Sequence, residues 1–274
     1  MSKQLSTRPF GTKDKVGYMF GNVANDLTFI MASMFLTVFY TDVLHINAGL
    51  VGAMFLVSRI VDAFTDTAMG RIADKVKAGK GGKFKPWLIR MCGPVALASF
   101  LMYQTAVVGA DMWVRIVYMF VTYLFYGSIC YTAINIPYGS MASVMSAEAD
   151  DRAALSTFRG VGSLLPQVLV GVVMPTFLYE KVMVDGVLKE VAVPNAFPIV
   201  ALILAIAAAG CYLLCYKMCT ERIPVDDEKK ANITPEEKDA NKATIVKCIA
   251  AILCAVIVAL NVSAAFKDLA EAVK

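Results

Sequence analysis

The stretch FLVSRIVDAFTDTAMGRIAD, residues 55–74, decides how the rest of the chain is interpreted. Arg59, Asp62 and Asp66 are spaced three and four positions apart, so on a helix they share one face, and apolar residues cover the remainder. Ionisable groups are costly inside a bilayer, and they mark ion or substrate pathways. Two carboxylates one turn apart suit a hard cation such as Na⁺, or either could carry a proton. The alternative is that Arg59 only pairs with these acids to hold helices together.

The composition is that of a membrane protein. Of the 274 residues, 58% are hydrophobic and 18% are charged, and the mean hydropathy is +0.63. A soluble domain has about 45–50% apolar and about 25% charged residues. The net charge is only +4, and the basic residues lie in short stretches between apolar segments. This pattern is typical of a membrane topology and not of a nucleic-acid-binding surface.

Other classes of site find little support. The seven cysteines show neither a disulfide framework nor the CxxC spacing of a metal site. Cys211, Cys215 and Cys219 share a helix face, and we interpret them as small packing residues. No nucleophile–base pair or nucleotide motif occurs, so we expect neither an enzyme nor a cofactor. The polar, basic start of the chain also lacks the pattern of a signal peptide.

Six apolar segments are expected to cross the membrane as helices, since a span needs about 20 residues. They cover residues 17–43, 48–72, 87–109, 112–144, 156–179 and 196–218. The predicted domains are a polar arm (1–15), a six-helix bundle (16–218), a hydrophilic linker (219–243), and a seventh apolar helix with a tail (244–274). The predicted fold class is thus an all-α membrane protein. Residues 180–195 are interpreted as a polar loop, and Pro137 is expected to bend or break its helix.

The distribution of basic residues predicts the orientation. The N-terminal arm, the loop between residues 71 and 90, and the linker carry most of the Lys and Arg, whereas the 180–195 loop has only Lys181 and Lys189. By the positive-inside rule the N-terminus is cytoplasmic, and six spans return the linker to the cytoplasm. We therefore expect a multi-pass protein of the cytoplasmic (inner) membrane.

Five motifs resemble those of the glycoside–pentoside–hexuronide:cation symporters, which belong to the major facilitator superfamily. They occur in the family's order and spacing, as GNVANDLTF, FYTDVL, VGAMFLVSRIVDAFTDTAMGRIADK, GKFKPW and YTAINIPYGSM, over about residues 15–160. The resemblance implies the N-terminal half of a transporter with two six-helix bundles and a binding site between them at mid-membrane. The fold would be this half-bundle plus one further apolar helix.

The resemblance also implies a cation site. The two acids of the family's cation motif match Asp62 and Asp66, which would bind the coupling cation, Na⁺ or H⁺. We assign Thr65 and Asn135 to the same site. The proline that follows the second acid in the family is Thr67 here.

A sugar site is implied in the same way. The acid of the first-segment motif matches Asp26, and the fifth-segment arginine matches Arg159, which could bind sugar hydroxyls or steady Asp26. Asn25, Thr132 and Asn135 complete the predicted set. In melibiose-type members the position of Asn135 is an acid that contacts sugar, so galactoside specificity and the choice of cation are both open.

Four residues at the end of the second segment are assigned to the cytoplasmic loop and its gating: Gly70, Arg71, Asp74 and Lys75. They begin a strongly basic stretch that continues to Arg90.

Two functions remain in competition. A family member has a second bundle, whereas here one apolar segment follows the linker, with no family motif recognised in residues 244–274. The first function is sugar:cation symport by an apparently truncated half, which would need a second copy or a separate second half. The second is a membrane scaffold or interaction subunit that keeps the fold without transport. The intramembrane charges favour the first, and the absent half favours the second for this polypeptide alone.

Overall fold

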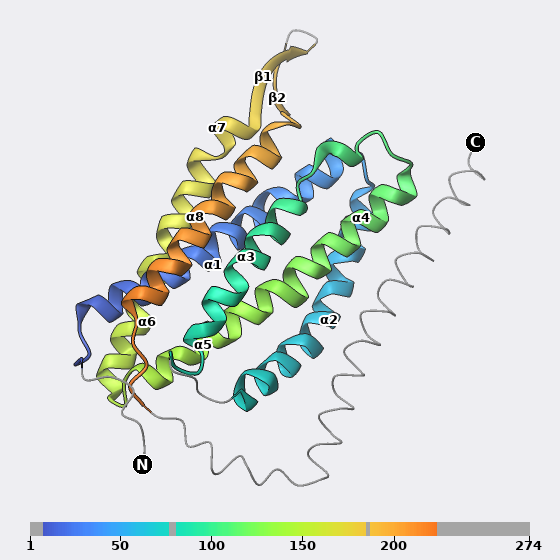
Figure 1. Ribbon diagram of the computed structural model, residues 1–274. Helices are drawn as coiled ribbons and strands as arrows, with labels where there is room; N and C mark the ends of the chain where they lie inside the picture. The colour runs from blue at the N-terminus through green and yellow to red at the C-terminus, as the bar shows by residue number, and fades with distance from the viewer. Residues whose placement is uncertain (1–7, 77–80, 185–186, 224–274) are drawn as a thin grey trace, which may run out of the picture.

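A computed structural model describes residues 8–76, 81–184 and 187–223 (Figure 1). The predicted linker beyond residue 223, the predicted helix at 244–274 and part of the N-terminal arm lie outside the described residues. Within the described ranges, six helical segments are long and apolar enough to cross a membrane. The predicted six-helix bundle is confirmed.

The first three spans are single helices with short additions. They comprise α1 (Thr12–Val38), continued by a π-helical turn (Phe39–Val43); α2 (Ala48–Lys75); and α3 (Lys85–Leu101), followed by a 3₁₀ turn (Thr105–Val107).

The last three spans are more segmented. They comprise α4 (Met112–Leu124), a π-helical segment (Phe125–Tyr131) and α5 (Thr132–Met145) as one span; α6 (Ala149–Val168), a π-helical turn (Leu169–Val173) and α7 (Pro175–Leu178) as the next; and α8 (Ala196–Met218). Strands β1 (Tyr179–Val184) and β2 (Val187–Ala192) connect α7 to α8.

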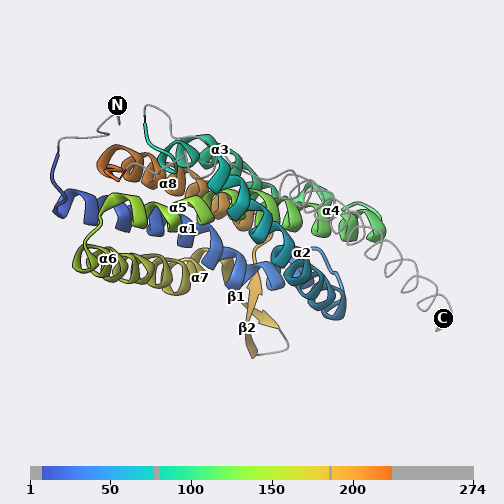
Figure 2. The same cartoon turned by 90° about the horizontal axis from the view of Figure 1, so that it is seen from below.

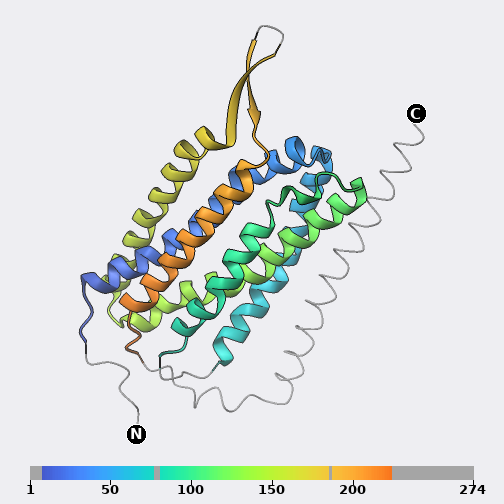
Figure 3. The ribbon, with the colours of Figure 1, turned by 45° about the horizontal axis from the view of Figure 1, so that its top comes forward.

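Helix α1 lies at the centre of the bundle and is buried along most of its length. It packs against α6 and α8, while α3 packs between α8 and α5, and α2 packs against α5. In Figures 1 and 3, α6 and α2 lie at opposite edges of the bundle. Gly17 allows α1 and α8 to approach closely, because a Cβ there would lie only 2.6 Å from the Cβ of Met218.

The fifth span begins earlier than expected, at Ala149 instead of residue 156. The acidic residues before the apolar run, interpreted as a loop, form its first turn. Asp150 and Asp151 lie near the helix N-terminus, where negative charge is favourable. Asp151 also accepts a hydrogen bond from the Ser146 hydroxyl at 2.6 Å. A search for apolar runs alone misses such a polar helix start.

The predicted polar loop at 180–195 is wrong. Strands β1 and β2 form an antiparallel hairpin in which Tyr179 pairs with Ala192 and Met183 with Leu188. Figures 1 and 2 show it projecting clear of the helices. The sequence held a signal, because Asp185 and Gly186 separate two runs rich in valine, and an Asp-Gly pair favours a two-residue hairpin turn. Over the ranges that the structure describes, the fold is therefore all-α apart from this hairpin.

The expected break at Pro137 does not occur. Helix α5 continues through it, and the irregularity falls earlier, in the π-helical segment Phe125–Tyr131. There the carbonyl of Gly127 accepts a hydrogen bond from the Thr132 hydroxyl at 3.2 Å. This contact belongs to the π-helical segment and not to Pro137, because the missing N–H of a proline leaves the carbonyl four residues earlier, here Ala133, without its helical partner.

Residues 219–223, predicted as the start of a hydrophilic linker, instead fold back onto the bundle. We call this segment the clasp. The N–H groups of Arg222 and Ile223 donate to the carbonyl of Val144 at 2.8 and 3.0 Å, respectively. Buried Glu221 accepts hydrogen bonds from the first residue of α3 and the two residues before it, through their backbone N–H groups at 2.6 to 2.9 Å: Lys83, Phe84 and Lys85.

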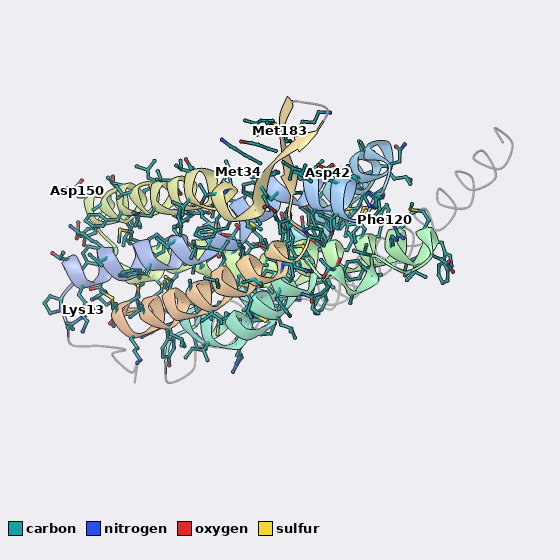
Figure 4. All side chains as sticks on the ribbon, turned by 90° about the horizontal axis from the view of Figure 1, so that it is seen from above. Lys13, Met34, Asp42, Phe120, Asp150 and Met183 are labelled. Carbon is teal, nitrogen blue, oxygen red and sulfur yellow. The ribbon has the colours of Figure 1, made fainter. Side chains whose placement is uncertain are left out.

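The clasp also reaches the beginning of α1. Asp14 is buried and pairs with Arg222 and Arg8, each at 2.7 Å. Arg8 donates in turn to the carbonyl of Met218 at 2.9 Å. The first and last spans therefore begin and end at the same end of the bundle. Figure 4 shows Lys13 at the end of the bundle where α1 begins, and Figure 1 shows the hairpin at the other end.

Candidate functional site

The two acids of α2 face the span formed by α4 and α5. The Ser128 hydroxyl donates to Asp62 Oδ1 at 2.6 Å, and the Thr132 hydroxyl donates to Asp66 Oδ1 at 2.8 Å. Ser128 and Thr132 are four positions apart, as are Asp62 and Asp66. Successive turns of one span therefore contact successive turns of the other. The predicted cation ligands thus share one side of α2 and one neighbouring element.

Arg59 contacts only one of these acids. Its guanidinium lies 3.7 Å from Asp62 Oδ2, and its side chain is 69% exposed against 21% for Asp62. Both residues belong to α2, so this pair does not tie two helices together. The geometry therefore gives no support to the alternative in which Arg59 pairs with these acids to hold helices together.

Thr65 is not brought to the acids. It is buried, and its hydroxyl donates to the backbone carbonyls of Val61 and Asp62 at 3.2 Å each. A threonine hydroxyl commonly bonds in this way to its own helix. In this structure Thr65 therefore contacts neither carboxylate, contrary to its predicted place in the cation site.

A second polar cluster joins α1, α5 and α8. Asn25 is 1% exposed. Its Oδ1 accepts a hydrogen bond from the Tyr212 hydroxyl at 2.6 Å, and its Nδ2 donates to Asn135 Oδ1 at 3.3 Å. Asn25 is thus held by protein groups on both sides, and Asn135 is the member of the pair that is less buried.

Asp26 and Arg159 meet through an intermediate residue. Arg159 Nε donates to Asn22 Oδ1 at 3.0 Å, and Asn22 Nδ2 donates to Asp26 Oδ2 at 2.8 Å and to Ser163 Oγ at 2.7 Å. The predicted steadying of Asp26 by Arg159 therefore runs through an amide. Among the described residues, no direct Arg159–Asp26 ion pair within 4.0 Å is present.

Helix α5 connects the two clusters. Thr132 and Asn135 are three positions apart at its start, and the first contacts Asp66 on α2 while the second contacts Asn25 on α1. A displacement of this turn of α5 would change both contacts together. This shared element is the clearest link between the predicted cation and sugar residues.

The predicted gating residues lie at the C-terminal end of α2. Arg71, Asp74 and Lys75 are exposed, and Gly70 is half-buried. The carbonyl of Asp74 accepts a hydrogen bond from the buried Lys83 ammonium at 2.6 Å. These residues therefore lie near the clasp, away from the polar clusters.

Sequence reasoning missed several residues of the clusters. Asn22 precedes Asp26 by four positions and Ser163 follows Arg159 by four, so helical spacing could have indicated both. Ser128 and Tyr212 gave no such signal, because their partners lie on other helices.

The cysteine stripe packs between helices. Cys215 Sγ lies 3.8 Å from Cys219 Sγ, and both residues are buried. The hydrogen bond with Cys215, together with burial, raises the pKa of the Cys219 thiol. In the part of the chain that the structure describes, no group of three or more metal-type ligands occurs.

A family model described as MFS/sugar transport protein matches residues 17–263. The chain belongs to this family. The match extends beyond the motifs recognised in the sequence and includes most of the predicted seventh segment. The predicted relationship to the glycoside–pentoside–hexuronide:cation symporters is confirmed by the relatives that follow.

A glucuronide carrier protein homolog from Escherichia coli (strain K12) is 32% identical over 265 residues, which are 96% of this chain and 54% of that protein. The isoprimeverose transporter of Lactiplantibacillus pentosus is 30% identical over 219 residues, 80% of this chain and 44% of the transporter. The putative glycoside/cation symporter YagG of E. coli (strain K12) is 36% identical over 147 residues, 54% of this chain and 31% of that protein. The chain spans about half the length of the curated relatives it matches.

Family membership and the six apolar spans together make this a multi-pass membrane protein. The two polar clusters therefore lie on helices that cross a bilayer, where such groups are expensive and mark transport pathways.

Proposed function

We propose that this chain is the N-terminal half-bundle of a sugar:cation symporter of the cytoplasmic membrane. The observation that carries the proposal is the start of α5, where Thr132 contacts Asp66 on α2 and Asn135 contacts Asn25 on α1. A symporter needs its two sites to respond to each other, and binding to either site here would bear on the same helical turn.

The coupling cation, Na⁺ or H⁺, binds at Asp62 and Asp66. Hard cations take oxygen ligands, and each carboxylate has one oxygen engaged by a hydroxyl. The second oxygen of Asp62 lies 3.7 Å from Arg59, so a cation there would replace or share this contact. Asn135 supplies a further oxygen or amide only if α5 moves, since its Oδ1 is taken by Asn25. Thr65 lies between the two acids in the sequence, and its hydrogen bond to the Val61 carbonyl helps to fix the helical turn that carries them.

The sugar binds at Asp26, Asn135 and Arg159, with Asn25 and Thr132 supporting them. Sugar hydroxyls both donate and accept, and a carboxylate, an amide and a guanidinium supply complementary partners in fixed directions. The names of two relatives, a glucuronide carrier homolog and an isoprimeverose transporter, support sugars of this general class as substrates.

The clasp end, with Gly70, Arg71, Asp74 and Lys75, faces the cytoplasm and takes part in gating. The basic residues of the 71–90 stretch support this orientation. A second bundle completes the pathway, since alternating access needs two bundles around one site.

Equilibrium binding tests this proposal. Membranes containing the chain are incubated with radiolabelled phenyl β-D-glucuronide or isoprimeverose, in Na⁺ or choline buffer and at several pH values. Asp62→Asn and Asp66→Asn are expected to abolish stimulation of sugar binding by the cation. Asp42→Asn is a matched control, because Asp42 is an exposed acid in the π-helical turn that ends the first span.

Symport is supported if Na⁺ or protons stimulate sugar binding in the wild type and in Asp42→Asn but not in the two α2 variants. Cation dependence that survives in both α2 variants contradicts the assigned cation site. Absence of sugar binding in the wild type favours the scaffold alternative.

A further inference from the structure

We propose that Asn22 is a positioning residue that holds Arg159 and Asp26 apart, so that both charges stay available to the substrate. The inference rests on the proposed sugar-binding role of these two residues. Asn22 belongs to the GNVANDLTF motif, yet neither the predicted site nor the proposed mechanism gives it a role.

The hydrogen bonds of Asn22 exclude a direct role in sugar binding. A side-chain amide has two N–H donors and one carbonyl. Both donors are used, on Asp26 at 2.8 Å and on Ser163 at 2.7 Å, and the carbonyl accepts from Arg159 Nε at 3.0 Å. Asn22 is also only 3% exposed. It therefore acts on its neighbours and not on the ligand.

Two contacts orient the Arg159 side chain and do not involve the two terminal nitrogens of its guanidinium. Its Nε is bound to Asn22, and its guanidinium carbon lies 5.5 Å from the centre of the Tyr138 ring. Among the described residues, the two terminal nitrogens make no hydrogen bond to protein. A guanidinium fork recognises two oxygens at once, so an Arg159 held in this way presents its binding edge to a ligand.

Without Asn22, the two charges would pair with each other. A guanidinium and a carboxylate attract strongly where the dielectric constant is low, and bidentate pairing would use the terminal nitrogens that a sugar needs. The Asn22 amide binds Arg159 Nε and Asp26 Oδ2. The terminal nitrogens of Arg159 and the other oxygen of Asp26 therefore do not bind each other.

Close helix packing makes the bridge possible. A Cβ at Gly162 would lie 2.9 Å from the carbonyl oxygen of Met19, so α6 approaches α1 more closely than a larger residue would allow. At this separation an asparagine side chain on α1 reaches Arg159 and Ser163 on α6 at once.

The test uses a probe that needs no knowledge of the sugar. Phenylglyoxal modifies free guanidinium groups, and the rate at Arg159 is followed by peptide mass spectrometry on the purified chain in nanodiscs. We expect Asn22→Ala to slow modification of Arg159 by about fivefold, because a direct carboxylate pair shields the fork. The double variant Asn22→Ala/Asp26→Asn is expected to restore the wild-type rate to within about twofold.

Ser163→Ala is the matched control, since it removes one partner of Asn22 and keeps the bridge between the two charges. Its modification rate is expected to match the wild type. Asn22→Ser, which is polar but too short to bridge, replaces Asn22→Ala if the alanine variant does not give a monodisperse sample. A rate at Arg159 that is unchanged or faster in Asn22→Ala or Asn22→Ser would overturn the inference, because a merely structural role predicts loosening.

Binding of phenyl β-D-glucuronide and isoprimeverose on the same samples separates this inference from the proposed function. A wild-type chain that binds neither sugar counts against the proposed function, and the modification rates still decide the role of Asn22. Where the wild type binds, Asn22→Ala is expected to weaken sugar affinity about tenfold, because Asp26 and Arg159 are no longer held in position to contact the sugar.

Discussion

At the scale of single residues, helical spacing indicates partners within a helix and not partners across helices. Asp62 and Asp66 could be placed on one face of α2 because they are four positions apart. Their hydroxyl donors on the neighbouring span could not be found, since that contact depends on how two helices are rotated about their axes. Thr65 lies on the same helix as the acids, but its hydroxyl donates to the backbone carbonyls of Val61 and Asp62, a contact that spacing alone does not indicate.

Asn135→Asp is expected to change sugar or cation preference more than stability. Asn25 Nδ2, which donates to the Asn135 oxygen at 3.3 Å, can donate equally to a carboxylate, so the local packing is kept. The new charge lies one turn from Thr132 and its contact with Asp66, where it would attract cations. Competition binding with a sugar panel in Na⁺ and in choline measures the preference, and the melting temperature measures stability.

Asn47→Asp provides the comparison for this change. Asn47 caps α2 by accepting from the Gly49 N–H at 2.7 Å, a role that aspartate fills as well. Identical sugar and cation preferences in Asn135→Asp, Asn47→Asp and the wild type would make position 135 structural.

Tyr212→Phe is expected to destabilise the bundle. Its hydroxyl is the partner of the buried Asn25 Oδ1, and an unpaired buried acceptor costs about 1–3 kcal/mol. The melting temperature in detergent should fall by several degrees. Tyr216→Phe, on the half-buried position one turn further along α8, should leave it unchanged, and equal melting temperatures for both variants would contradict the assigned hydrogen bond.

At the scale of elements, the length of each apolar segment predicts the membrane spans. The clasp and the hairpin could not be predicted in this way, because both contain charged residues. The six helices were predictable because each has enough apolar residues to cross a bilayer. The clasp was not, because Glu221 and Arg222 resemble any hydrophilic linker until their partners on α1 and α3 are brought near. The hairpin was missed for a simpler reason: its Lys and Glu residues outweighed the turn signal at Asp185 and Gly186.

Glu221→Gln is expected to loosen the start of α3. A carboxylate that accepts three backbone N–H groups at a helix N-terminus is favoured by charge as well as by hydrogen bonding. The neutral amide loses one acceptor oxygen and should cost about 1–2 kcal/mol. Hydrogen exchange of residues 83–85 should increase and the melting temperature should fall.

Gly82 gives a second way to test the clasp. It has a φ of 107°, and a Cβ there would lie 2.5 Å from the Glu221 carboxyl carbon, so Gly82→Ala should have the same effect. Glu190→Gln on the exposed hairpin is the control for charge. Unchanged exchange at residues 83–85 in both clasp variants would show that the cap is not needed.

At the scale of the whole molecule, the described residues form one bundle, and some charged residues of its α2 helix are exposed on its surface. Asp66 and Arg59 are exposed, and each charge that meets lipid costs at least about 2.5 kcal/mol. Whether the charged side of α2 meets lipid or protein cannot be read from one bundle's sequence, because it depends on a partner that the motifs do not specify.

A single copy is therefore expected to carry out no coupled transport. The purified chain is reconstituted in liposomes at a dilution of at most one copy per vesicle, and uptake of phenyl β-D-glucuronide or isoprimeverose is driven by a Na⁺ or proton gradient. No uptake is expected at this dilution, because alternating access requires two bundles. Gradient-driven uptake by single copies would show that one bundle suffices.

The hairpin has a practical consequence for imaging. A bundle of this kind, in a chain of 29.6 kDa, offers an electron microscopist little to align, because a detergent belt hides nearly all of it. The strands from Tyr179 to Ala192 extend clear of the helices at one end only (Figure 1). A compact domain spliced between Val184 and Val187 would stand outside the belt, giving each particle a visible marker of its orientation and a way to count the bundles that assemble around it.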